Sequence, residues 1–331
     1  MNDIVKLALD SYHGKASGNF SYADNMTALR EALIDANGGS TKLDLKKIRD
    51  GKCAGLFTIL EETLRVTNEE GIRGDELFMN LVDYRNIGAG DENRFYIPDN
   101  TYYMVSELAE GSQAIRRQRL NAGTEVTVPI HVFGLKIYDE VNRVLSGRID
   151  FNELIDRANK SYIQKTRNEI FGLWNGLSEK DLGTTYYPTK GTYDESKLLE
   201  LIDHVEAATG LSATIYGTKK GLRKLQIANI SDEGKSDLYN IGYLGKFYGT
   251  PVVAMKQLHK LGTNEFLLDD DKIYVIASGD RPIKYVTAGD PTIIMGDPTS
   301  NADLTQEFTY IDMHGLAFAP ATQMGIYETS N

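Results

Sequence analysis

Residues 85–132 read RNIGAGDENRFYIPDNTYYMVSELAEGSQAIRRQRLNAGTEVTVPIHV, and this is the most informative stretch of the chain. It belongs to a segment, about 74–132, whose residue types predict one strand after another, at 94–97, 101–105, 115–120 and 124–133. In the last of these, Val126, Val128 and Ile130 alternate with polar residues or proline, a period of two that is typical of a half-buried strand. The segment nevertheless has too few apolar residues for a core, and a two-stranded ribbon is only marginally stable alone. We therefore expect contacts outside its own domain to stabilise it.

The sequence before this segment predicts an arm followed by a helix. Residues 1–41 are polar and contain glycine, so we expect a mostly extended or weakly ordered arm with one short helix at 26–37. Apolar residues at helical spacing predict a single helix over 43–66, despite the interruption at Gly51.

The sequence after the segment predicts a short helix at 137–145 and a much longer one over 150–176. Asp150, with Glu153 three residues later, has the pattern of a capping box, and Gly176 suits a C-cap. About 26 residues at ~1.5 Å per residue make a rod of roughly 39 Å, over twice the usual helix length. We expect this helix to be a spine of the fold.

From about residue 192 the pattern changes to short helices that alternate with strands. Helices are predicted at 195–209 and 219–226, and strands at 213–216, 251–255, 272–277 and 283–286. Two closing strands are predicted at 307–312 and 315–319, with a turn or bulge at His314. The region 191–305 is thus expected to form a compact α/β unit, in which helices and strands cover each other.

Composition and charge exclude several classes of protein. The chain has 331 residues and a formal net charge of −11, which argues against a protein whose main task is to neutralise phosphates. Cys53 is the only cysteine, so a disulfide framework within the chain is excluded. The sequence contains neither a signal-peptide run nor the ~20 apolar residues of a membrane span. We expect synthesis and assembly in the cytoplasm.

Motifs that mark an active site are missing from the sequence. NISDEGKS at 229–236 ends like a phosphate-binding loop, but Asn229 stands where that loop needs glycine, so a surface loop is favoured. The run Asp269–Asp271 could bind a divalent cation, although a tight charged turn is favoured. The five histidines are scattered and are expected to be surface or packing residues. We expect no catalytic residue, no metal and no cofactor.

Two basic clusters remain to be explained. Arg116, Arg117 and Arg119 lie in the strand-rich segment, where alternation places Arg117 and Arg119 on one face and Arg116 on the other. Arginine forks suit bidentate contacts, so we expect these residues to pair with acids on a neighbouring molecule. The second cluster, at 219–224, is expected to be a solvated face of a short helix.

Taken in order, these segments resemble the major capsid proteins of tailed bacteriophages, which have the Hong Kong 97-type fold. DENRFYIPDN at 91–100 and IRRQRLNAGTEVTVPIHVFGLKIYDEV at 115–141 resemble the extended loop of such proteins and its return into the peripheral domain. GLSATIYGTKKGLRKL at 210–225, GYLGKFYGTPVVAM at 242–255 and DDKIYVIASGDRPIKYV at 270–286 resemble the axial domain. The resemblance covers nearly the whole chain.

The resemblance implies an α+β fold with five parts: an N-terminal arm at 1–50, a helix leading to the loop at 51–73, an extended β-ribbon loop at 74–132, a peripheral domain with the spine helix at 133–190 and 306–331, and an axial α/β domain at 191–305. The implied function is self-assembly through hexamers and pentamers into an icosahedral shell around the double-stranded DNA of a tailed phage. A portal would be a further partner. The protein would be located in the virion and would not be an enzyme.

Two departures from the family carry expectations of their own. Some members join subunits through a lysine of the extended loop, but no lysine lies between Lys52 and Lys136, so we expect a noncovalent shell. Some members also carry a scaffolding segment of roughly one hundred residues before the arm, for which this chain has no room. We therefore expect a separate scaffolding protein.

Interface hot spots are usually buried aromatic residues and arginines. The candidate contacts between subunits are therefore Phe95, Tyr96, Tyr102, Arg116, Arg117 and Arg119. Two alternatives remain open. An encapsulin-like compartment would use the same fold to enclose cargo enzymes, and a cytosolic α/β enzyme would carry a ligand pocket in 191–305.

Overall fold

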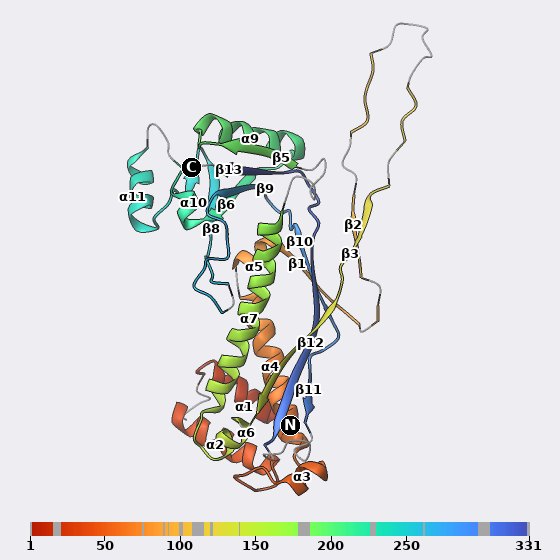
Figure 1. The fold of residues 1–331 in the computed structure, drawn as a ribbon, viewed down its shortest axis with the longest axis vertical. Coiled ribbons are helices and arrows are strands. Elements are labelled where there is room, and N and C mark those ends of the chain that lie inside the picture. The colour runs from red at the N-terminus through yellow and green to blue at the C-terminus, as the bar shows by residue number, and fades with distance from the viewer. Residues whose placement is uncertain are drawn as a thin grey trace.

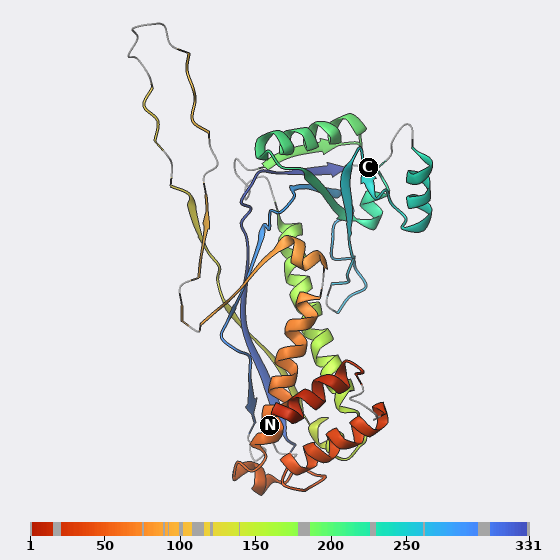
Figure 2. The same ribbon diagram turned by 180° about the vertical axis from the view of Figure 1, so that it is seen from behind.

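A computed structural model describes residues 2–15, 21–74, 76–88, 90–91, 93–98, 102–107, 116–119, 122–138, 140–177, 186–225, 230–260, 262–296 and 305–329. Two sheets follow each other along the longest axis of the molecule, and a long helix connects their levels (Figure 1). A two-stranded ribbon projects away from both sheets (Figures 1 and 2). The mixture of helices and sheets confirms the α+β class.

The long helix α7 (Phe151–Gly176) confirms the predicted spine. Asp150 caps it by accepting a hydrogen bond from the Asn152 backbone N–H, and its apolar stripe is buried along the whole length. Gly176 is the last helical residue, and Leu177 takes the C-cap position. Helix α4 (Ala54–Arg73) packs against α7. The two helices are closest at Gly71, where a Cβ atom would lie only 2.5 Å from Ile163 Cδ1.

The N-terminal segment is helical, which corrects the expectation of a mostly extended arm. It forms α1 (Asn2–Tyr12), α2 (Tyr22–Ala36) and α3 (Leu45–Arg49). Leu29 and Leu33, one helical turn apart, are buried in the same core as Leu56 of α4, so packing on α4 orders these helices. Gly51, at φ +71°, separates α3 from α4 where one continuous helix was expected.

One sheet has five strands: β1 (Val82–Ile87), β4 (His131–Tyr138), β10 (Ile283–Ala288), β11 (Thr292–Met295) and β12 (Glu307–Phe318). The order is β1-β10-β12-β11, with β4 on the other side of β12, and β1 is parallel to β10. Helix α5 (Glu76–Leu81) and β1 therefore occupy the start of the segment 74–132, and the ribbon begins only after β1. β12 is continuous, because His314 pairs with His131 on one side and Thr287 on the other, so the expected turn is wrong.

The strand predicted over 124–133 is two strands. β3 (Thr124–Thr127) belongs to the ribbon, whereas β4 belongs to the five-stranded sheet. Pro129 lies between the two strands and has no N–H to donate to a neighbouring strand. Its carbonyl oxygen lies close to Gly315, where a Cβ atom would be only 2.1 Å from that oxygen. Helix α6 (Glu140–Leu145) starts later than predicted, because Ile137 and Tyr138 still pair with β12.

The second sheet has six strands: β5 (Tyr186–Gly191), β6 (Ala213–Thr218), β7 (Lys246–Phe247), β8 (Thr250–Met255), β9 (Lys272–Ala277) and β13 (Met324–Thr329). Its order is β5-β13-β9-β6-β8-β7. Helices α9 (Glu195–Thr209), α10 (Lys219–Leu222) and α11 (Asp232–Asn240) accompany it. β10 and β11, which were expected in the axial domain, lie in the five-stranded sheet, whereas β13 and most of β5, which were expected in the peripheral domain, lie here.

Two chain crossings and helix α7 connect the sheets. Residues 278–282 lead from β9 to β10, and residues 319–323 lead from β12 to β13. The crossings are hydrogen-bonded to each other: the Asp280 carboxylate accepts from the Thr322 backbone N–H at 2.9 Å, and the Ala319 N–H donates to the Pro282 carbonyl at 2.7 Å. At the upper end of α7, fully buried Trp174 packs on Tyr274 of one sheet and Phe318 of the other.

Candidate assembly surfaces

The base of the ribbon is anchored in its own subunit. β2 (Arg94–Ile97) pairs antiparallel with β3, and Arg94 forms an ion pair with Glu125 at 3.2 Å. Phe95 is 2% exposed and packs against Val128 and Val286, with the Arg85 guanidinium 3.9 Å from its ring centroid. Phe95 therefore holds the ribbon to the sheet, which corrects its assignment as a contact with another subunit.

Farther along the ribbon the side chains are uncovered. Tyr96 is exposed, and its hydroxyl accepts a hydrogen bond from the Gly123 N–H. Tyr102 is 85% exposed, and the next three residues, Tyr103, Met104 and Val105, are exposed as well. These three were not among the contacts predicted from the sequence. Four consecutive large apolar side chains are unusual on a folded surface, and a contact between this run and another molecule stays a prediction.

The two arms of the ribbon are joined by a side chain at this level. The predicted strands at 101–105 and 115–120 are not formed at 102–105 and 116–119, while residues 101, 115 and 120 lie outside the described residues. Instead, the Gln118 amide accepts from the Met104 N–H and donates to the Met104 carbonyl, both at 2.7 Å. Gln118 thus takes the place of a strand residue opposite Met104.

The three arginines of the ribbon carry positive charge into solvent. Arg116, Arg117 and Arg119 are all exposed. Within the described part of the chain, none of the three forms an ion pair or hydrogen bond. Their pairing with acids of a neighbouring molecule stays a prediction.

A second uncovered apolar group lies on the opposite side of the six-stranded sheet from the ribbon, around α11 (Figures 1 and 2). Tyr239 of α11 is 93% exposed, and Ile241 and Tyr248 are exposed nearby in the sequence. Tyr248 has φ +48°, and its hydroxyl donates to Glu195, which fixes the turn between β7 and β8. Exposed aromatic groups thus occur on two sides of the molecule.

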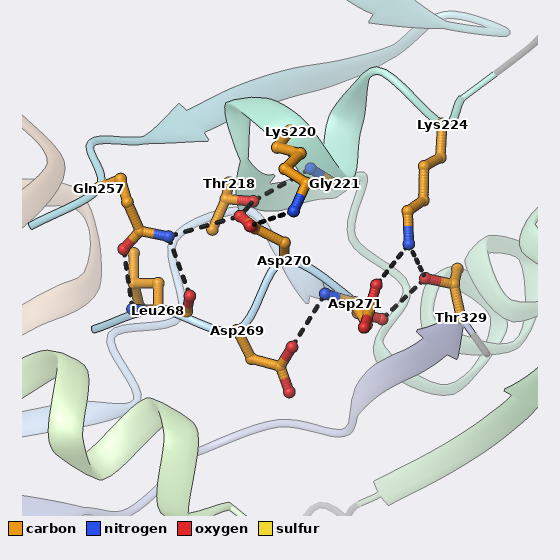
Figure 3. A network of polar contacts seen from close by, with 10 residues as sticks. All are labelled: Thr218, Lys220, Gly221, Lys224, Gln257, Leu268, Asp269, Asp270, Asp271 and Thr329. Atoms are coloured by element: carbon orange, nitrogen blue, oxygen red, sulfur yellow. Dashed lines mark hydrogen bonds and ion pairs between the residues drawn. The ribbon is translucent and has the colours of Figure 1, made fainter. Parts of the chain in front are cut away.

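The acidic run Asp269–Asp271 is a charged turn, as favoured from the sequence (Figure 3). Asp269 accepts from the Asp271 N–H, and Asp270 binds Thr218 at 2.6 Å and Lys220 at 3.1 Å. Lys224 binds Asp271. Burial acts to raise the pKa of Asp270, but these hydrogen bonds and the Lys220 charge lower it overall. In the basic cluster at 219–224, Lys219, Lys220 and Arg223 are exposed, as expected for a solvated face, although Lys220 and Lys224 also pair with these aspartates.

A buried ionic cluster joins the spine helix to the five-stranded sheet. His314 of β12 is 1% exposed, with Nδ1 3.1 Å from Asp312 and Nε2 3.1 Å from Glu169 of α7. Its ring stacks on Phe133 at 4.0 Å between centroids. Burial alone would lower the pKa of His314, but Asp312 and Glu169 raise it above the usual value. The sequence did not reveal this cluster, because Glu169 lies 145 residues before His314 in the chain.

The segment 229–236 and the possible metal-binding groups bear on whether the chain has a ligand site. Part of NISDEGKS is helical and not a surface loop: Ser231 caps α11 by accepting from the Gly234 N–H, while residue 229 lies outside the described residues. Among the residues that the structure describes, no group of three His, Cys, Asp or Glu side chains is arranged to hold a metal ion. In the same residues, no helix has the length and apolar content that crossing a membrane requires.

Comparison with known proteins supplies a family. The sequence matches, over residues 29–327, the family described as "SPbeta prophage-derived putative capsid protein YonB". None of the curated proteins matches the chain.

The chain is similar to several solved structures. The capsid subunit of the bacteriophage PhiM1 mature capsid has a TM-score of 0.50 and 9% identity, over 76% of this chain and 86% of that one. The capsid of the cyanophage P-SCSP1u gives 0.49 and 12%, over 77% and 88%. A virus-like particle from Pyrococcus furiosus gives 0.45 and 13%, over 80% and 98%.

Proposed function

The chain belongs to the YonB family of SPbeta prophage-derived capsid proteins, and from this premise we propose how its copies are joined. It is a major capsid protein with the Hong Kong 97-type fold, it assembles with copies of itself into an icosahedral shell, and it is a structural protein of the virion and not an enzyme. We propose that hexamers and pentamers are the units of this shell, and that the shell encloses double-stranded DNA.

The uncovered ribbon is the observation that carries this proposal. Its exposed run at 102–105 and its free arginines lie on one side of the six-stranded sheet, and the exposed group around α11 lies on the other. Two different surfaces on opposite sides suit head-to-tail contacts, and such contacts form a ring when the rotation from copy to copy closes. A ring of five or six copies would cover both surfaces of every subunit.

The parts of the subunit are assigned by their sheets. We propose that the six-stranded sheet with α9–α11 is the axial domain, and that the five-stranded sheet with α1–α7 is the peripheral domain. The extended loop is then the ribbon after β1, and the N-terminal segment is a packed helical element. A net charge of −11 fits a shell that does not itself attract DNA.

Negative-stain electron microscopy of the purified protein tests this function. We expect round shells or rings of five and six copies, whereas a discrete dimer would exclude polymerisation. Particles from infected or induced cells should contain DNA, and a cargo protein in its place would select the encapsulin-like alternative. We also propose a portal and a separate scaffolding protein as partners; uniform shells from the chain expressed alone would reject the latter.

A further inference from the structure

A cavity of about 70 Å³ lies between helix α4 and one edge of the five-stranded sheet. Two side chains that line it, Asn68 and Tyr310, are more than nine-tenths buried. Neither Asn68 Oδ1 nor the Tyr310 hydroxyl has a hydrogen-bond partner among the described residues. Buried polar atoms without partners cost stability, so the cavity is suited to a group that donates hydrogen bonds.

The charges around the cavity favour a cation. Arg65 and Arg73 line it, but Arg65 binds Glu62 at 2.8 Å and Arg73 binds Glu69 at 2.7 Å. Their charges are therefore compensated by carboxylates of the same helix. Asp290 also lines the cavity, is exposed, and has no ion pair within the described residues. The uncompensated charge at this edge of the sheet is therefore negative.

The aromatic faces of the lining are already covered. Tyr84 and Tyr285 line the cavity and are stacked on each other at 5.6 Å, and the Arg73 guanidinium lies 5.3 Å from the Tyr84 ring centroid. The lining therefore offers an incoming group hydrogen-bond acceptors and negative charge. A guanidinium group has five N–H donors and a permanent positive charge, which suits such a lining.

Two arginines of the chain are free for this role. Arg117 and Arg119 are exposed, and they form no ion pair within the described residues. The segment that holds them belongs to the ribbon, which projects away from the body that contains the cavity (Figures 1 and 2). We propose that in the shell one guanidinium of the pair Arg117 and Arg119 enters this cavity on a neighbouring copy. It donates to Asn68 Oδ1, and Asp290 balances its charge at the rim. This inference rests on the proposed function.

A charge exchange tests the proposal. The measured quantity is the subunit concentration above which shells form. Asp290→Arg should raise it at least about tenfold, as should Arg→Glu at whichever of positions 117 and 119 occupies the cavity, because each change places like charges together. Combining Asp290→Arg with the matching Arg→Glu should restore assembly to within about threefold of the wild type. Arg116→Glu, at the third exposed arginine of the ribbon, is the matched control and should give no such rescue.

Asn68→Leu provides an independent arm. It should raise the concentration for assembly, and adding the matching Arg→Ala should raise it no further, because both changes remove the same hydrogen bond. The urea midpoint of each unassembled variant checks its folding. Losses that multiply in the double variant, normal assembly of Asp290→Arg, or equal rescue by Arg116→Glu would each overturn the proposal. If the wild-type protein forms no shells, the proposed function is wrong. If shells form but Asp290 and the ribbon arginine show no rescue of each other, only the proposed binding of the arginine in the cavity is wrong.

Discussion

Replacing His314 with phenylalanine removes the cation at the centre of the buried cluster and keeps an aromatic ring against Phe133. Asp312, whose side chain is 7% exposed, then loses the imidazole 3.1 Å away, whereas Glu169 is 23% exposed and keeps Lys165 at 3.0 Å. Breaking a fully buried ion pair costs about 3–5 kcal/mol. Because only one of the two carboxylates is left deeply buried and unpaired, we expect a loss of about 3 kcal/mol for His314→Phe.

The effect should depend on pH in a defined direction. The pKa of His314 is raised in the folded state, so the folded chain binds this proton more tightly than the unfolded chain does. The stabilisation is therefore complete below the unfolded pKa of about 6.5 and is lost as pH rises through the folded-state value. A neutral imidazole can donate to only one carboxylate, so the advantage of the wild type over His314→Phe should shrink between pH 6 and pH 9.

Urea unfolding of unassembled subunits at pH 6 and pH 9 measures both effects. The control is His204→Phe, since His204 lies on α9 with its side chain 56% exposed, and this change should alter the free energy of unfolding by less than about 0.5 kcal/mol. A loss below about 1 kcal/mol for His314→Phe at pH 6, or an equal loss at both pH values, would refute this reasoning.

Three further outcomes are expected. Shells boiled in detergent should run as monomers, because no lysine lies between Lys52 and Lys136 to cross-link the ribbon, and a ladder of bands would contradict this. Gln118→Ala should leave the urea midpoint unchanged but speed tryptic cleavage at the ribbon arginines severalfold, since it removes both hydrogen bonds to Met104; equal cleavage rates would count against the bridge. Mg²⁺ or Ca²⁺ should not raise the melting temperature, because Asp269–Asp271 already bind lysine, threonine and backbone N–H groups; a rise of several degrees would reopen a cation site.

Local patterns predicted the elements whose signals lie within a few residues. The spine helix, the helix at 195–209 and the strand at 272–277 have the expected bounds to within a residue. The pattern of apolar residues defines each one, and Asp150 and Asp194 cap the two helices. Of the first two helices, only α2 was predicted, as a helix at 26–37, whereas α1 was missed because its apolar face becomes meaningful only when α4 is there to cover it.

Pairing between distant segments could not be read from the sequence. β1 pairs with β10 about 200 residues later, and the same period of two is compatible with either sheet. The strand at 283–286 was therefore predicted in the α/β unit of 191–305, and β13 was not predicted as a strand. The same limit applies to the candidate site. Arg117 and Tyr102 are exposed as a surface role requires, but Phe95 is covered by Val286, which no local pattern near the ribbon indicates.

The two hydrogen-bonded crossings between the sheets have a mechanical consequence. Two bodies joined by one linker can swing freely about it. Here residues 278–282 and 319–323 run between the sheets together, tied by Asp280 and Thr322, and Trp174 of the helix is clamped where both sheets meet. Bending the halves against each other would stretch one crossing while compressing the other. The two halves of the subunit should therefore move as one rigid body under outward pressure, and the ribbon should be the part that deforms.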